Sequence, residues 1–161
     1  MHPQQIHTEE VLPDPTLLGH HAPKWTLNPG WQNSIQSPEE LHGRWAILLF
    51  FNIGCPGCTG RALPFARELL AQFPELSIVG IHTDFESYTP LTRIKTVMDY
   101  LDPPYPIVCD YGDSTFRRYY GEGTPQWIIV EPSGVVHRSI FGSIAANQQR
   151  IDYVLREVFQ V

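Results

Sequence analysis

The chain has 161 residues, of which 42% are apolar and 12% aromatic, a composition typical of one globular domain rather than a disordered protein. Its longest apolar run, 45–51, is far shorter than the ~20 residues that cross a bilayer. Seventeen acidic residues against eleven basic ones give a net charge of −6, which argues against nucleic acid or an anionic membrane as a partner. We therefore expect proteins or small molecules as partners.

The first part of the chain is rich in proline, which indicates turns and short extended pieces. Six of the fifteen prolines precede Arg44. We expect residues 1–17 to form a flexible tail and residues 18–161 to form the domain. Ser37, followed by Pro38 and by Glu40 at the third helical position, predicts the start of a short helix over 37–41.

The later elements alternate between strands and helices. Segment 45–53 is apolar on both faces, which is typical of the central strand of a covered parallel sheet. Apolar periodicity predicts helices over 56–72, kinked at Pro64, over 90–101, and from a Ser143 cap to 159, with a short helix at 113–120. Strands are expected over 76–83 and 106–109, and a hairpin over 126–131 and 135–140. This order predicts an α/β fold of three layers, a central mixed sheet with helices on both faces.

Cys55 and Cys58 form a CxxC motif between the first strand and the following helix. The unpaired N–H groups and the dipole of that helix favour a thiolate on Cys55, which we expect to be the accessible thiol. Cys58, one turn further, is expected to be protected and to close a disulfide with Cys55. Pro56 fixes φ in the first helical turn, and Gly57 adds no side chain that would obstruct a substrate. The motif therefore predicts redox chemistry.

Two other interpretations of these cysteines are a zinc half-site and a pair of unrelated buried thiols. A structural zinc site needs two more ligands, and the seven histidines are scattered without helical i, i+4 spacing, so we expect no metal site. Cys109 ends the strand at 106–109. Two strand spacings of ~4.8 Å place it beyond the ~7 Å reach of a disulfide with the motif. We expect a buried thiol there, and a resolving or regulatory role is the alternative.

The segment WAILLFFNI followed by Cys55-Pro56-Gly57-Cys58, and the later Gly123-Thr124-Pro125 before the hairpin, resemble the thioredoxin superfamily. The helix and strand inserted between them resemble the insertion of its TlpA-like and redoxin-type, peroxiredoxin-like branches, and the resemblance extends from about residue 18 to the C-terminus. It implies a thioredoxin-like fold in which Pro125 is a cis-proline and Thr124 offers its backbone to a substrate beside Cys55. Pro56 and Gly57 complete the implied substrate-binding set. From spacing alone, Pro125 would instead be a trans proline that opens an edge strand.

Several positions depart from the family pattern. Leu49 stands where many thioredoxins have a buried acid, and Arg61 stands where TlpA-like proteins usually have a glutamate. Arg61 is a candidate modulator of the thiolate, because it follows Cys58 by three residues on the same helix; the alternative is a solvent-exposed arginine. A peroxidase of this superfamily needs a threonine three residues before its reactive cysteine and a proline four residues before that. Asn52 and Leu48 hold those positions, so we do not expect peroxidase chemistry.

The function that we expect is thiol–disulfide oxidoreduction with a protein disulfide or a low-molecular-weight thiol, by a monomer without a bound cofactor. The alternatives are a module that holds a metal such as Cu(I) between the two thiols and an adaptor whose cysteines are idle. Met1 and Met98 are the only methionines that could add a soft ligand. We expect the cytoplasm as the compartment, because no signal peptide is visible, and the periplasm is the alternative.

Overall fold

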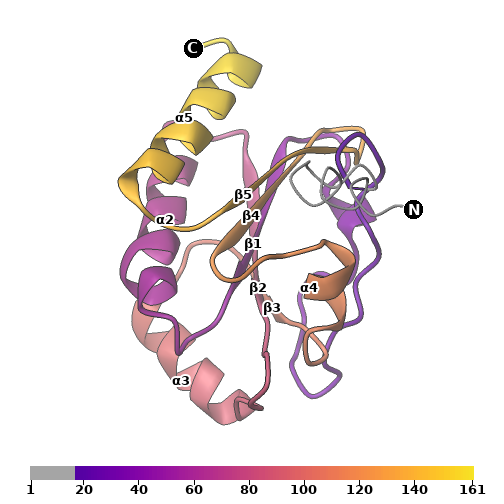
Figure 1. The fold of residues 1–161 in the computed structure, drawn as a ribbon, viewed down its shortest axis with the longest axis vertical. Coiled ribbons are helices and arrows are strands. Elements are labelled where there is room, and N and C mark those ends of the chain that lie inside the picture. The colour runs from indigo at the N-terminus through magenta and orange to yellow at the C-terminus, as the bar shows by residue number, and fades with distance from the viewer. Residues whose placement is uncertain (1–16) are drawn as a thin grey trace, which may run out of the picture.

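The computed structural model describes residues 17–161. The predicted tail, 1–17, lies outside these residues except for Leu17, whose side chain is only 3% exposed and belongs to the core. The described chain forms a five-stranded sheet with a layer on each face (Figure 1). Within it, none of the helices combines the length and the apolar character that crossing a bilayer requires.

The sheet is mixed, as the sequence predicts. Its strands lie in the order β3-β2-β1-β4-β5. β2 is parallel to both β1 and β3, whereas β4 is antiparallel to both β1 and β5. The strands are β1 (Ala46–Phe51), β2 (Ser77–His82), β3 (Ile107–Cys109), β4 (Gln126–Val130) and β5 (Val136–Phe141). The α/β class and the antiparallel hairpin at one edge are therefore confirmed.

The helices divide between the two faces of the sheet (Figure 1). One face packs against α2 (Leu63–Gln72), α3 (Leu91–Leu101) and α5 (Ala145–Phe159). The other packs against α4 (Ser114–Arg118) and the N-terminal segment 17–35. The segment expected as a helix at 37–41 is a 3₁₀ turn, η1 (Pro38–Leu41). The predicted Ser143 cap is wrong: α5 begins after Ile144, and its N-cap has no side-chain hydrogen bond.

Strand β1 lies at the centre of both hydrophobic cores. All six of its residues are 0% exposed. Because successive side chains of a strand point to opposite faces, Ile47 and Phe51 join the core under α2, α3 and α5, whereas Leu48 and Phe50 join the core under α4. The interpretation of this segment as a central strand is confirmed, and its end fixes where the CxxC motif begins.

The helix after the motif contains a π-helical turn that the sequence analysis did not predict. In this turn, η2 (Cys58–Ala62), the N–H of Leu63 donates to the carbonyl of Cys58, five residues earlier. Pro64 follows in the first turn of α2. A proline ring in a regular α-helix presses on the carbonyl four residues before it, and a wider turn relieves that contact. The helix therefore accommodates Pro64 with an extra residue in the preceding turn.

The N-terminal segment pairs with both edges of the sheet. At the β3 edge, the N–H of Asn28 donates to the carbonyl of Cys109 at 2.9 Å. At the β5 edge, the N–H of Gly19 donates to the carbonyl of Val136, also at 2.9 Å. Isolated bridges join His21 to Val135 and Leu27 to Asp110. The expectation of short extended pieces is therefore confirmed, and these pieces connect the two edges.

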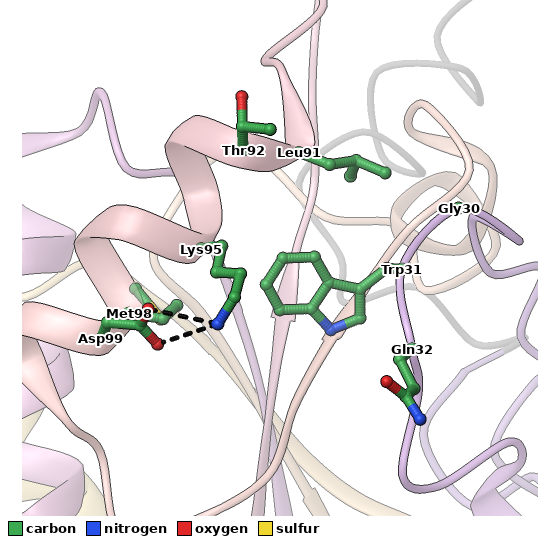
Figure 2. Close-up of a pocket in the computed structure, with 8 residues that line it drawn as sticks. All are labelled: Gly30, Trp31, Gln32, Leu91, Thr92, Lys95, Met98 and Asp99. Carbon is green, nitrogen blue, oxygen red and sulfur yellow. Dashed lines mark hydrogen bonds and ion pairs between the residues drawn. The ribbon is translucent and has the colours of Figure 1, made fainter.

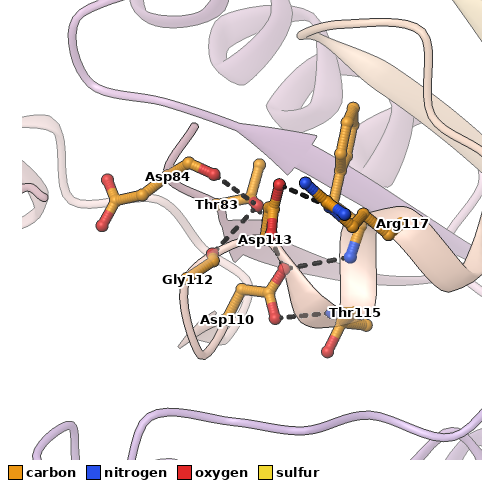
Figure 3. Close-up of polar contacts among 8 residues, drawn as sticks. Thr83, Asp84, Asp110, Gly112, Asp113, Thr115 and Arg117 are labelled. Carbon is orange, nitrogen blue, oxygen red and sulfur yellow. Dashed lines mark hydrogen bonds and ion pairs between the residues drawn. The ribbon is translucent and has the colours of Figure 1, made fainter. Parts of the chain in front are cut away.

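A buried carboxylate fixes the chain that follows β3 (Figure 3). Asp110 accepts the backbone N–H groups of Thr115 at 2.8 Å and Phe116 at 3.0 Å, and the hydroxyl of Thr83 at 3.0 Å. Burial raises the pKa of Asp110, and these hydrogen bonds act in the opposite direction. The network ties the loop after β2 to the start of α4.

The close packing of the sheet can be tested at Gly80 in β2. A Cβ on this residue would lie 2.6 Å from Ile107 Cδ1 and 3.2 Å from Phe51 Cε1. We predict that Gly80→Ala lowers the free energy of unfolding by about 1–3 kcal/mol, since the side chains of Ile107 and Phe51 must shift to admit the methyl group. Gly60→Ala is the matched control, because a Cβ there meets no atom within 4 Å. Urea unfolding measures both, and equal midpoints for Gly80→Ala and the parent would contradict this packing.

Candidate functional site

A tight turn after β1 presents the first cysteine of the motif. The N–H of Cys55 donates to the carbonyl of Asn52 at 3.0 Å, and the N–H of Gly54 donates to Oδ1 of Asn52 at 2.8 Å. The side chain of Asn52 also reaches the neighbouring strand, because its Nδ2 donates to the carbonyl of Thr83 at 2.8 Å. The turn is thus closed by Asn52 and attached to the end of β2.

Cys55 lies at the N-terminus of the following helix, where the sequence analysis places it. Its carbonyl accepts the N–H groups of Cys58 at 3.0 Å and Thr59 at 3.2 Å, which are the first helical hydrogen bonds. The side chain of Cys55 is half-buried, whereas Cys58 is 0% exposed. All three cysteines of the chain are free thiols in this structure. The two thiols of the motif therefore differ in access to solvent.

The environment of Cys58 strongly favours its protonated form. Burial, and then the neighbouring Cys55 side chain, raise the pKa of Cys58 to about 12. Hydrogen bonds from the Asn52 backbone and the Thr124 side chain act in the opposite direction but are weaker. Near neutral pH Cys58 is therefore a thiol. It lies beside two groups, the Asn52 backbone and the Thr124 side chain, that would stabilise its thiolate.

The loop before β4 faces the motif. The Thr124–Pro125 peptide bond is cis, as the resemblance implies. The Cys55 thiol donates to the carbonyl of Thr124 at 3.5 Å, and Thr124 thus approaches both cysteines. The carbonyl of Pro125 accepts the N–H of Gly142 at 2.8 Å, which joins this loop to the chain after β5.

Ser143 is a neighbour of the motif that the sequence analysis assigned only to a helix cap. A Cβ on Gly57 would lie 2.6 Å from Oγ of Ser143, so the glycine allows this close approach. Pro56, beside it, is exposed. The hairpin register could have indicated this neighbour: Phe141 pairs with Gln126, so the residues after β5 lie beside Pro125.

The structure does not bring Arg61 into contact with the thiols. Its side chain is exposed, and no hydrogen bond or ion pair of its guanidinium is found among the residues that the structure describes. Arg61 is also absent from the groups that shift the pKa of Cys58. Among the described residues, Arg61 is related to the motif only by its position, three residues after Cys58 on the same helix.

Cys109 lies apart from the motif strand. It pairs with His82 of β2, which in turn pairs with Phe51 of β1. It is 2% exposed, and burial raises its pKa to about 12, with the carboxylates of Asp84 and Asp110 adding to the effect. The expectation of a buried thiol is confirmed.

A pocket of about 450 Å³ lies between the N-terminal segment and α3 (Figure 2). Trp31, Leu91 and Met98 contribute apolar surface, and the ion pair of Lys95 with Asp99, 3.2 Å long, lies at its rim. None of the residues lining this pocket belongs to the CxxC motif or to the loop before β4. Residues 17–161 also contain no group of three or more His, Cys, Asp or Glu side chains placed to hold a metal ion.

Known structures resemble this fold along most of its length. A thioredoxin-like superfamily protein has a TM-score of 0.72 and 24% identity, over 84% of this chain and 95% of its own. A thiol-disulfide isomerase from Corynebacterium glutamicum has a TM-score of 0.64 and 24% identity, over 89% and 92%. The thioredoxin domain of a thiol-disulfide oxidoreductase from Bacteroides vulgatus has a TM-score of 0.69 and 19% identity, over 86% and 98%. These similarities show a thioredoxin-like fold.

Sequence comparisons are consistent with that fold. A search of curated proteins gives no match. The sequence pattern of the AhpC/TSA family, in contrast, matches residues 18–139, which include the motif, the inserted helix and strand, and most of the hairpin. The resemblance to the thioredoxin superfamily is confirmed, and the chain belongs to the AhpC/TSA family.

Proposed function

We propose that this protein is a thiol–disulfide oxidoreductase in which Cys55 attacks and Cys58 resolves. The observation that supports this most directly is the contrast between the two thiols. Cys55 is half-buried at a helix N-terminus and faces the carbonyl of Thr124 at 3.5 Å, whereas Cys58 is fully buried one turn behind it. An accessible nucleophile with a protected partner is the arrangement that disulfide exchange needs.

The reaction proceeds in two exchanges. The Cys55 thiolate attacks one sulfur of a substrate disulfide; a new S–S bond forms, the substrate bond breaks, and the released thiolate takes a proton from solvent. Cys58 then attacks the Cys55 sulfur and expels the second substrate sulfur, which takes up the proton that Cys58 loses. The two electrons come from the two cysteines, which end as a disulfide. The same steps in reverse oxidise a dithiol.

The residues around Cys55 are assigned to substrate binding. The carbonyl of Thr124 and the cis bond to Pro125 border the thiol, and an extended substrate chain would lie along this loop. Pro56 is exposed beside Cys55, and Gly57 allows the close approach of Ser143 on its other side. Protein disulfides and low-molecular-weight thiols are the proposed substrates, and the proposed state is a monomer.

We propose disulfide exchange rather than peroxide reduction. Asn52 stands where the peroxidase pattern has a threonine, and its amide is already bound by the N–H of Gly54 and the carbonyl of Thr83. Leu48, at the position of the proline, is a buried core residue.

The cytoplasmic location expected from the sequence stays a prediction.

The function can be tested by insulin reduction with dithiothreitol. We predict that the wild type accelerates the reaction, that Cys55→Ser abolishes the acceleration, and that Cys58→Ser accumulates a mixed disulfide with an insulin chain. Cys109→Ser, the matched control, should keep the wild-type rate. A wild type no faster than dithiothreitol alone would contradict the proposal. Tight Cu(I) binding by such an inert protein would favour a metal-binding module, and rapid consumption of hydrogen peroxide would favour a peroxidase.

The different roles of the three cysteines predict selective alkylation. Between pH 6 and pH 9, iodoacetamide should label Cys55 alone, because Cys58 and Cys109 are buried and the pKa of each is raised to about 12. At pH 9 a thiol with that pKa is ionised to only about one part in a thousand. Peptide mapping measures the adducts, and labelling in urea should reach all three. A main adduct on Cys58 or Cys109 in the folded protein would reverse the assignment.

The proposed role of Arg61 as a thiolate modulator needs its own test. Arg61→Glu replaces a positive charge near the helix N-terminus by a negative one and should slow alkylation of Cys55 near neutral pH by about two- to fivefold. Arg150→Glu makes the same change of net charge on an exposed residue of α5 and should leave the rate unchanged. Equal rates for both variants would leave Arg61 as an ordinary surface residue.

A further inference from the structure

We propose that His82 is a positioning residue for Cys55, because its ring nitrogen Nε2 accepts the N–H of Ile53 and so fixes the turn that presents the thiol. His82 contacts neither a substrate nor the motif sulfurs in this assignment and acts through the backbone of the turn. The proposal deepens the proposed function and rests on it for the role of Cys55. In the sequence, His82 is one of seven scattered histidines, and no local pattern marks this role.

The ring of His82 is held on several sides. His82 is the last residue of β2, it pairs with Phe51 and Cys109 on the two neighbouring strands, and it is 2% exposed. The ring of Phe51 meets the imidazole edge to face, with centroids 5.3 Å apart. The carbonyl of His82 accepts the N–H of Asp110 at 2.8 Å. The backbone and the imidazole ring of His82 are therefore both fixed in position.

The turn itself shows why the acceptor matters. Three consecutive N–H groups, those of Ile53, Gly54 and Cys55, lie between β1 and the helix. The second and third donate to Asn52, within the turn. The first donates to Nε2 of His82 at 3.2 Å and so links the turn to a different strand. Together with the contact of Asn52 Nδ2 to the carbonyl of Thr83, this bond fixes the turn on the end of β2.

The hydrogen bond requires a neutral ring. Nε2 accepts only when it bears no proton, so the ring proton must lie on Nδ1. Burial lowers the pKa of His82 to about 4, although the carboxylate of Asp84, in the loop after β2, acts in the opposite direction. The neighbouring Cys109 of β3 stays a thiol, since its pKa is raised to about 12. His82 is therefore an acceptor throughout the neutral range.

The position of this turn bears directly on exchange. The Cys55 sulfur must approach an incoming disulfide in line and then lie within reach of Cys58, and a displacement of about 1 Å at such a centre slows reactions severely. The same turn places the Asn52 backbone against the Cys58 sulfur. A turn released from β2 would thus misplace both the attacking sulfur and a group that stabilises the resolving one.

Two matched variants separate hydrogen bonding from packing. His82→Gln puts an amide oxygen the same number of bonds from Cα as Nε2, whereas His82→Met fills the space without a comparable acceptor. Insulin reduction and the rate of Cys55 alkylation are measured for both variants, at temperatures well below their unfolding midpoints. We expect His82→Met to slow both rates by about tenfold, and His82→Gln to keep them within about threefold of wild type. An equal loss of rate in both variants would overturn the proposal, and so would wild-type rates in both.

A measurement on the wild type needs no variant to fold. Nitrogen NMR of the histidine ring should find the proton on Nδ1, and the amide of Ile53 should exchange more slowly than that of an exposed loop residue. A proton on Nε2 would refute the assignment. Neither NMR nor alkylation needs a substrate disulfide. A wild type that fails to reduce insulin therefore refutes only the proposed function. The role of His82 in fixing the turn is tested separately, by the NMR measurement and by the rate of Cys55 alkylation.

Discussion

The complete burial of β1 is the constraint on which the site depends. Its six side chains enter two cores, so the strand can neither slide nor rotate without exposing apolar surface or opening a cavity. The chain consequently leaves the sheet at one fixed point, after Phe51. The turn at Asn52 and the helix that begins at Cys55 are short extensions of that fixed point, and this explains how the Cys55 sulfur is held in one place.

The same geometry separates two chemically identical groups. One helical turn moves a thiol from the protein surface into the core, where burial, and then the neighbouring Cys55 side chain, raise the pKa of Cys58 far above that of an ordinary cysteine. Thr124 touches both members of the pair, from a loop that follows the motif by about seventy residues in the sequence and is held by the chain after β5. The site is therefore assembled from both halves of the domain, across the junction between β1 and β4.

The features predictable from the sequence are those with a local pattern. The apolar run of β1, the helical periodicities and the turn at residues 132–134 were sufficient for the order and class of the elements, and the cysteine spacing was sufficient for the motif. Three features had no such pattern. The contact of His82 with Ile53 depends on the register between β1 and β2, the approach of Ser143 to Gly57 depends on the hairpin register, and the π turn depends on how the helix adapts to Pro64. The first two arise from tertiary packing, whereas the π turn is a local response to Pro64.

The N-terminal segment has a consequence for the behaviour of the protein at high concentration. The outer backbone groups of an edge strand are a template for another chain, and unprotected edges promote aggregation. Here residues 19–28 already bond to Cys109 of β3 and to Val136 of β5. The N-terminal segment thus covers part of the β3 edge and part of the β5 edge. It thereby reduces the backbone surface on which a strand of another molecule could pair. A proteolytic cut between Gly19 and Asn28 would therefore threaten colloidal stability before it disturbed the cysteines.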